Sequence, residues 1–179
     1  MLMITNTLLF FHMNLNFSSI EEKNRKDVIE NCYVPLLDLA ETSKIKIAIE
    51  ASGYTLLEIK KIAPEVLVRF KHLIERRKIE FIGCGYVQLI SAIAPYEVNC
   101  KNIEIGIQIY QNLLGLVPKY MLVNEMAYSR SIVDIMLEYK FQGILVERNN
   151  VEYAFKDKTG SSNDILNMIS LKALQKNPK

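Results

Sequence analysis

Five short apolar runs alternate with helix-like segments along this chain, and that alternation constrains its fold more than any other feature. The runs have the length of buried strands, and the segments between them repeat apolar residues at helical spacing. Strands that alternate with helices form a parallel sheet with right-handed crossovers. The predicted strands lie at 8–11, 44–49, 79–82, 120–123 and 142–146.

The helix ends carry local signals. Ser18 and Ser19 predict the N-cap of a first helix of about five turns, with a bend at Pro35. The other helices are predicted from residue 55, over 64–78, up to a stop at 115–118 and from a cap at Ser131.

The strand-and-helix pattern weakens beyond residue 150. Residues 1–150 form one predicted domain, and 151–179 are predicted as a polar loop followed by a short helix over 165–174. A closed barrel takes about seven or eight βα units. The chain is therefore either an open sheet or the first part of a larger barrel. An exposed edge after the fifth strand would favour a homodimer or pairing with a complementing chain.

Composition excludes several classes of protein. The chain has 179 residues, half of them hydrophobic, which suits one globular domain. Its 22 Lys and Arg residues nearly balance 20 Asp and Glu residues, so no nucleic-acid partner is indicated. Residues 1–11 are too short to span a membrane and lack a basic start. Three widely spaced cysteines suit a reducing compartment, so we expect a cytoplasmic protein.

Polar residues follow three predicted strands at the point where each apolar run stops. His12 and Asn14 follow the first strand, Gln88 lies in the loop after the third, and Glu125 follows the fourth. The carboxyl ends of parallel strands lie at one edge of the sheet, where α/β proteins build their sites. The strand ends therefore predict one shared site.

Four short motifs occur in order at these strand ends: His12, Ser52-Gly53, Gly85-Tyr86-Val87-Gln88 through Pro95, and Glu125 with Tyr128. In this order they resemble the N-terminal part of the family-57 glycoside hydrolases, over about residues 8–150. The resemblance implies an α/β fold of parallel (β/α) repeats that is part of an incomplete (β/α)7 barrel. It also implies a retaining enzyme that acts on α-glucans.

The resemblance also implies roles for individual residues. Glu125 falls on the catalytic nucleophile of the family. Asn14, Leu15 and Asn16 stand where the family has histidine, glutamine and proline, and Gln88 replaces a carboxylate. These departures indicate a divergent subgroup with different sugar contacts. The predicted substrate-binding residues are His12, Asn14, Ser52, Tyr86, Gln88 and Tyr128.

A retaining glycosidase needs two carboxyl groups about 5–5.5 Å apart, one as nucleophile and one as acid/base. The family's acid/base is an aspartate on a later strand, and no residue of this chain aligns with it. Glu50 and Glu147 follow strands and could supply a second carboxylate, or could pair with Arg148 or Arg130. We expect feeble turnover, because general acid assistance is worth roughly two to four orders of magnitude in rate.

Several residues also have structural interpretations. Glu125 could form an ion pair, and His12 could be a core histidine bonded to a backbone carbonyl. His72 is predicted on a helix surface, and Arg76-Arg77-Lys78 is predicted as a solvated helix end. Tyr86 and Tyr128 could stack on sugars or pack in the core.

Three functions therefore stay open. The first is a carbohydrate-active protein of the family-57 type, acting on an oligo- or polysaccharide without a cofactor or metal. The second is a non-catalytic sugar-binding or regulatory module. The third is a polysaccharide deacetylase, which would need an Asp and two His residues as metal ligands, whereas one histidine is suitably placed here.

Overall fold

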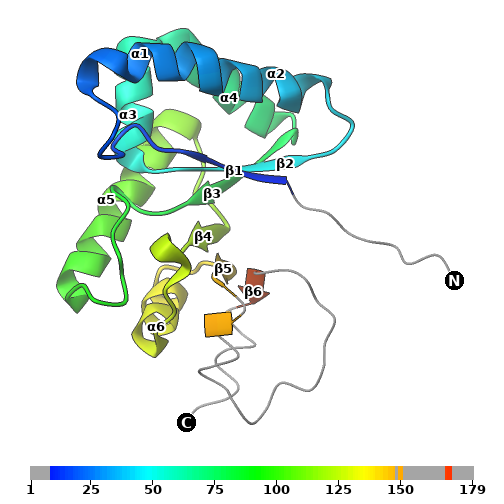
Figure 1. Cartoon of the computed structure of the whole chain (residues 1–179). Helices are drawn as coiled ribbons and strands as arrows, with labels where there is room; N and C mark the ends of the chain where they lie inside the picture. Colours follow the sequence, from blue (N-terminus) through cyan, green and yellow to red (C-terminus); the bar gives the residue numbers. More distant parts are fainter. Residues whose placement is uncertain (1–8, 148, 151–167, 171–179) are drawn as a thin grey trace, which may run out of the picture.

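The computed structural model describes residues 9–147, 149–150 and 168–170. Its sheet holds six strands in chain order, of which the first five are parallel (Figure 1). The prediction of parallel (β/α) repeats is confirmed. The second strand starts later than predicted, because the exposed residues 44–46 precede it and all five of its own residues are buried. The strands are β1 (Leu9–Met13), β2 (Ile47–Ala51), β3 (Ile79–Gly83), β4 (Tyr120–Leu122), β5 (Gly143–Leu145) and β6 (Met168–Ser170).

Helices connect the parallel strands. In Figure 1 the helices between β1 and β3 lie above these strands, and the last helix lies beside β4 and β5. The helical segments are η1 (Glu22–Asn24), α1 (Arg25–Val28), η2 (Ile29–Tyr33), α2 (Val34–Thr42), α3 (Gly53–Ile62), α4 (Pro64–Glu75), α5 (Tyr96–Leu114), η3 (Asn124–Met126) and α6 (Arg130–Glu138).

A π-helical turn precedes Pro35, where the sequence predicts a bend. The π-helical turn η2 ends immediately before α2, which carries Pro35 in its first turn. Proline has no N–H and its ring collides with the carbonyl one turn earlier, so the wider turn accommodates it.

Two predicted N-caps are wrong by a few residues. The first helical region starts at Glu22, beyond Ser18 and Ser19, and α6 starts after Ser129, before Ser131. The hydroxyls of Ser129 and Ser131 lie 3.0 Å apart. Short polar clusters offer several capping positions, so sequence alone does not choose among them.

The sixth strand replaces a predicted helix. Residues 168–170 pair antiparallel with β5, so the helix expected over 165–174 is wrong at these three residues. The pairing satisfies backbone groups along the outer edge of β5. The predicted open edge after the fifth strand is therefore covered over the described residues, and the rest of segment 151–179 lies outside them.

The two faces of the sheet have different surroundings. Successive side chains of a strand point to opposite faces. Ile47 and Ile49 of β2 belong to the large core under the helices, whereas Ala48 belongs to a smaller cluster with Ile82 and Leu122. Glu50 alternates with Ile49, so its side chain lies on the face of the smaller cluster. This is the inner face of the predicted barrel.

The β3 loop (residues 84–88) lies between α3 and α5. The backbone N–H groups of Gly53 and Tyr54 donate to the carbonyls of Gly85 and Tyr86, at 2.9 and 2.8 Å. Tyr86 N–H in turn donates to the carbonyl of Asn102 in α5, at 2.8 Å. The N-terminus of α3 and the middle of α5 thus hold the loop from both sides.

Gly106 allows α5 to approach the β3 loop. A Cβ atom at Gly106 would lie 2.6 Å from the Gly85 carbonyl carbon and 2.7 Å from its Cα, both backbone atoms. Alanine ordinarily stabilises a helix interior over glycine by about 1 kcal/mol. We expect the opposite sign here, because α5 or the loop must move to admit the methyl group.

Gly106→Ala should therefore lower the free energy of unfolding by about 1–3 kcal/mol, as overpacked sites do. Urea unfolding followed by circular dichroism measures the change. Gln108→Ala, at an exposed position of the same helix, is the control and should stay within about 0.5 kcal/mol of the parent. A Gly106→Ala protein as stable as the parent would contradict the close helix–loop contact.

Candidate functional site

A histidine and a glutamate meet at the carboxyl ends of β1 and β2. His12 and Glu50 are partners in the parallel register of these strands. Nδ1 of His12 lies 2.8 Å from Oε2 of Glu50. The Glu50 side chain is fully buried, whereas 48% of the His12 side chain is exposed. The pair therefore places an imidazole at the surface above a buried carboxylate.

Two amides extend this pair into a polar chain. Nε2 of Gln88 donates to Oε2 of Glu50 at 3.4 Å, and Nδ2 of Asn14 donates to Oε1 of Gln88 at 2.6 Å. Oε1 of Glu50 is buried and has no hydrogen-bond partner among the described residues. A buried acceptor in this state costs on the order of 1–3 kcal/mol. Such costly buried groups concentrate at functional sites.

Neutral groups lie beneath Glu50. Burial raises the pKa of the Cys84 thiol well above its usual value, and the charge of Glu50 raises it further. Burial also raises the pKa of the Tyr110 hydroxyl. This hydroxyl donates to the carbonyl of Gly85 at 2.7 Å, lies 3.1 Å from the carbonyl of Ala51, and accepts from the N–H of Cys84 at 3.2 Å. Tyr110 therefore joins the ends of β2 and β3.

A cleft of about 520 Å³ opens at the carboxyl ends of the strands, within the usual size range of ligand sites. Polar side chains from three strand ends share it with apolar ones. Its lining residues are His12, Asn14, Phe17, Gln88, Ile90, Leu122, Val123, Asn124, Glu125 and Met126.

Glu125 lies on a strained turn in this cleft. It adopts a left-handed backbone with φ 55° and ψ 13°, and Met126 follows with φ 49°. This conformation is unfavourable for residues other than glycine, and it occurs preferentially at functional sites. The side chain of Glu125 is exposed and has no hydrogen-bond or ion-pair partner in the described part of the chain.

Two asparagines hold the turn that carries Glu125. Nδ2 of the buried Asn124 donates to the carbonyl of Leu89 at 3.0 Å. Nδ2 of Asn150 donates to the carbonyl of Met126 at 2.8 Å. The turn is therefore attached to the segment after β3 and to the segment after β5.

The structure gathers four of the seven predicted site residues. His12, Asn14, Gln88 and Glu125 line the cleft, whereas Ser52, Tyr86 and Tyr128 are not among its lining residues. Ser52 is 1% exposed and is the N-cap of α3, where it accepts from the N–H of Thr55 at 3.1 Å.

The two tyrosines have different surroundings. The ring of Tyr86 packs edge-on against Tyr54 with centroids 6.2 Å apart. Tyr128 packs against the core beside α6, and its burial raises the pKa of its hydroxyl.

The predicted pairing of Glu50 is corrected, whereas a pairing of Glu147 with Arg148 stays a prediction. Among the described residues Glu50 pairs with His12 and with no arginine, and His12 is therefore not a core histidine bonded to a carbonyl. Nε of Arg130 lies 3.8 Å from Oδ1 of Asp134 in the same helix. Glu147 is exposed and accepts from Asn149 at 3.3 Å, and Arg148 lies outside the described residues.

Sequence reasoning missed Cys84, Tyr110 and Asn124. Strand alternation would have placed Cys84 on the same face as Ile82. Nothing in the local sequence marks Tyr110, because its hydroxyl bonds residues 25 and more positions away.

No group of three or more His, Cys, Asp or Glu side chains among the described residues is arranged to hold a metal ion. No helix in this part of the chain has both the length and the apolar character needed to cross a bilayer.

The His12–Glu50 pair should contribute to the free energy of unfolding. His12→Ala should lower the free energy of unfolding by about 2 kcal/mol, because it removes the main partner of a buried carboxylate. The loss should be smaller than the roughly 3–5 kcal/mol of fully buried pairs, since water can enter where His12 was. Adding Glu50→Gln to His12→Ala should recover part of the loss.

Urea unfolding of the two single variants and the double variant measures this coupling. His72→Ala is the control, because His72 lies on the exposed surface of α4, as predicted. Its Nδ1 is 3.9 Å from Oε2 of Glu75. Additive losses in the double variant would contradict the pairing.

Comparison with known proteins places the fold. A model of glycosyl hydrolase family 57 matches residues 3–172. No curated protein matches the chain. The 4-alpha-glucanotransferase of Thermococcus litoralis is 22% identical with a TM-score of 0.68, and the match covers 88% of this chain and 24% of that one.

Two other solved structures are similar. The alpha-amylase AmyC of Thermotoga maritima is 14% identical with a TM-score of 0.63, covering 78% of this chain and 39% of that one. The branching enzyme of Pyrococcus horikoshii is 13% identical with a TM-score of 0.63, covering 81% and 42%. At these identities the likeness shows a common fold, and the chain spans less than half of each of these proteins. Since the family model matches nearly the whole sequence, the chain belongs to glycosyl hydrolase family 57.

Proposed function

We propose that this chain binds an α-glucan in the cleft at the carboxyl ends of its strands, and that Glu125 is the nucleophile of a retaining hydrolase or transglycosylase. One observation carries the proposal. The exposed carboxylate of Glu125 shares a cleft with His12, Asn14 and Gln88, and a strained turn presents it there. The names of the similar solved structures, a glucanotransferase, an amylase and a branching enzyme, support the same class of substrate.

The cleft suits a sugar chain chemically. His12, Asn14 and Gln88 supply hydrogen-bond donors and acceptors for hydroxyl groups. Phe17 and Ile90 are exposed apolar residues at the same cleft and offer surface to the apolar face of a pyranose ring. A mixture of apolar walls and a few polar groups is typical of small-molecule sites.

In this proposal Glu125 attacks the anomeric carbon and forms a covalent glycosyl-enzyme intermediate. An exposed carboxylate without an internal partner is available for such an attack. The turn around it is held through Asn124 and Asn150, so the carboxylate needs little reorganisation to react.

The acid/base is the open part of the mechanism. Glu125 is the sole carboxylate lining the cleft among the described residues. Glu50 is fully buried and already bonded to His12, which makes it a poor second carboxylate. We therefore propose that this chain alone turns over unactivated glycosides feebly, by roughly two to four orders of magnitude less than a complete pair would.

The presence of one carboxylate in the cleft, among the described residues, also supports the second candidate, a sugar-binding or regulatory module without turnover. A single cleft carboxylate is enough for binding but not for acid-assisted cleavage. The deacetylase alternative has no supporting donor set in the described residues. A cytoplasmic location and pairing with a second copy or a complementing chain stay predictions.

A fluorinated α-glucosyl fluoride tests the nucleophile directly. Fluoride leaves with little acid assistance, so the reagent reports on Glu125 even when the acid/base is missing. We expect intact-mass spectrometry to show a covalent glucosyl adduct, and peptide mapping to locate it on Glu125.

Two variants control this experiment. Glu125→Gln should give no adduct, and Glu147→Gln, which alters an exposed carboxylate after β5, should label like the parent. An unlabelled parent protein with native circular dichroism would overturn the nucleophile assignment and favour the sugar-binding module.

A further inference from the structure

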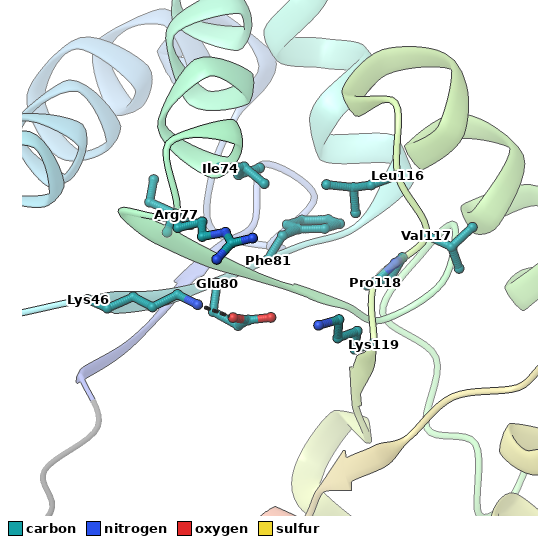
Figure 2. A pocket seen from close by; sticks show the side chains of 10 residues that line it. Lys46, Ile74, Arg77, Glu80, Phe81, Leu116, Val117, Pro118 and Lys119 are labelled. Carbon is teal, nitrogen blue, oxygen red and sulfur yellow. Dashed lines mark hydrogen bonds and ion pairs between the residues drawn. The ribbon is translucent and has the colours of Figure 1, made fainter.

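A second hollow lies at the opposite, amino end of the sheet (Figure 2). Its volume is about 400 Å³, which is enough for a small metabolite. The walls come from the starts of β2, β3 and β4 and from the end of α4. No lining residue belongs to the cleft that contains Glu125. The lining residues are Lys46, Ile74, Arg77, Ile79, Glu80, Phe81, Leu116, Val117, Pro118 and Lys119.

Cations outnumber carboxylates in this hollow. Lys46, Arg77 and Lys119 come from three separate segments, and Glu80 is the one acidic residue among them. Glu80 is already paired with Lys46. Arg77 and Lys119 have no side-chain hydrogen bond or ion pair among the described residues. In Figure 2 their side chains extend over the hollow from different directions. Arg77 and Lys119 therefore supply two positive charges that have no carboxylate partner among the described residues.

Arg77 occupies a backbone position that favours glycine. It has φ 58°, its N–H donates to the carbonyl of Ile74, and the N–H of Lys78 donates to the carbonyl of Leu73, both at 2.9 Å. This is the hydrogen-bond pattern of a Schellman helix end, where the left-handed residue is usually glycine. The end of α5 follows that rule with Gly115 at φ 76°, whereas the end of α6 has Lys140 at φ 63° with the same two hydrogen bonds.

The helix dipole does not account for Arg77. Cations stabilise a helix C-terminus, but the neighbouring Arg76 and Lys78 already supply two at the end of α4. Lys78 also donates to the carbonyl of Ser43 at 3.0 Å. Strained residues concentrate at ligand sites, so the backbone of Arg77 adds to the evidence of the two unpaired cations in the hollow.

We propose that this hollow binds a phosphate monoester with a compact ring as its body. A phosphate dianion matches the two unpaired positive charges, and a guanidinium group binds phosphate through paired N–H donors. Phe81, Leu116 and Pro118 form an apolar wall against which a sugar ring can lie. Glu80 can accept a hydrogen bond from a ring hydroxyl. The site is independent of the function proposed for Glu125.

Equilibrium binding of inorganic phosphate and of glucose 6-phosphate to the full chain tests this proposal. Calorimetry at constant ionic strength, set with chloride, keeps general screening equal in all titrations. We expect a dissociation constant in the millimolar range for phosphate and at least fivefold tighter binding of glucose 6-phosphate. An equal affinity for both would overturn the part of the proposal that concerns the ring.

Three variants assign the site. Arg77→Gly should weaken the binding of glucose 6-phosphate at least tenfold, while the protein without ligand becomes no less stable, since glycine suits the left-handed position. Lys119→Gln should weaken binding in the same direction. Arg76→Gln removes an exposed charge from the same helix end and should leave the affinity within twofold. Absence of binding, or an equal loss in the Arg76 and Arg77 variants, would overturn the proposal.

Discussion

The parallel register of β1 and β2 is the constraint on which the carboxyl-end site depends, because it sets His12 beside Glu50. A shift of one residue would send every side chain of a strand to the opposite face. Glu50 would then enter the large core under the helices with no partner, and an unpaired buried carboxylate is among the costliest features a fold can contain. The apolar residues of both strands therefore select the register, and the register in turn provides Glu50 with His12.

The remaining parts of the site are attached to this pair by separate elements. Tyr110 joins the ends of β2 and β3, and Gly106 lets α5 lie directly on the β3 loop. The loop can then place Gln88 between Glu50 and Asn14. Glu125 is held independently, through Asn124 and Asn150. A rigid polar chain and a strained, exposed carboxylate thus face one cleft, which is the arrangement expected of a preorganised site.

Much of the fold follows from local patterns in the sequence, and much of the site does not. Apolar runs and helical spacing located all five parallel strands, and a carboxylate directly after an apolar run identified Glu125 as a candidate. The pairing of His12 with Glu50 joins residues 38 positions apart, so it becomes visible when the strand register is known. The resemblance to the family predicts Ser52 as a substrate contact, and in the structure its buried hydroxyl caps α3. The short strand at 168–170 depends on an available edge of β5, which no local propensity encodes.

Nuclear magnetic resonance of the imidazole groups tests the central claim, that the cleft lined by His12 and Glu125 binds an α-glucan. The chain has two histidines, so the spectrum contains one signal from the cleft and one from His72 on the outer surface of α4. Titration with a linear maltooligosaccharide should shift the His12 signals in a saturable manner and leave those of His72 in place. Unchanged His12 signals at saturating sugar, or equal shifts of both residues, would contradict the account.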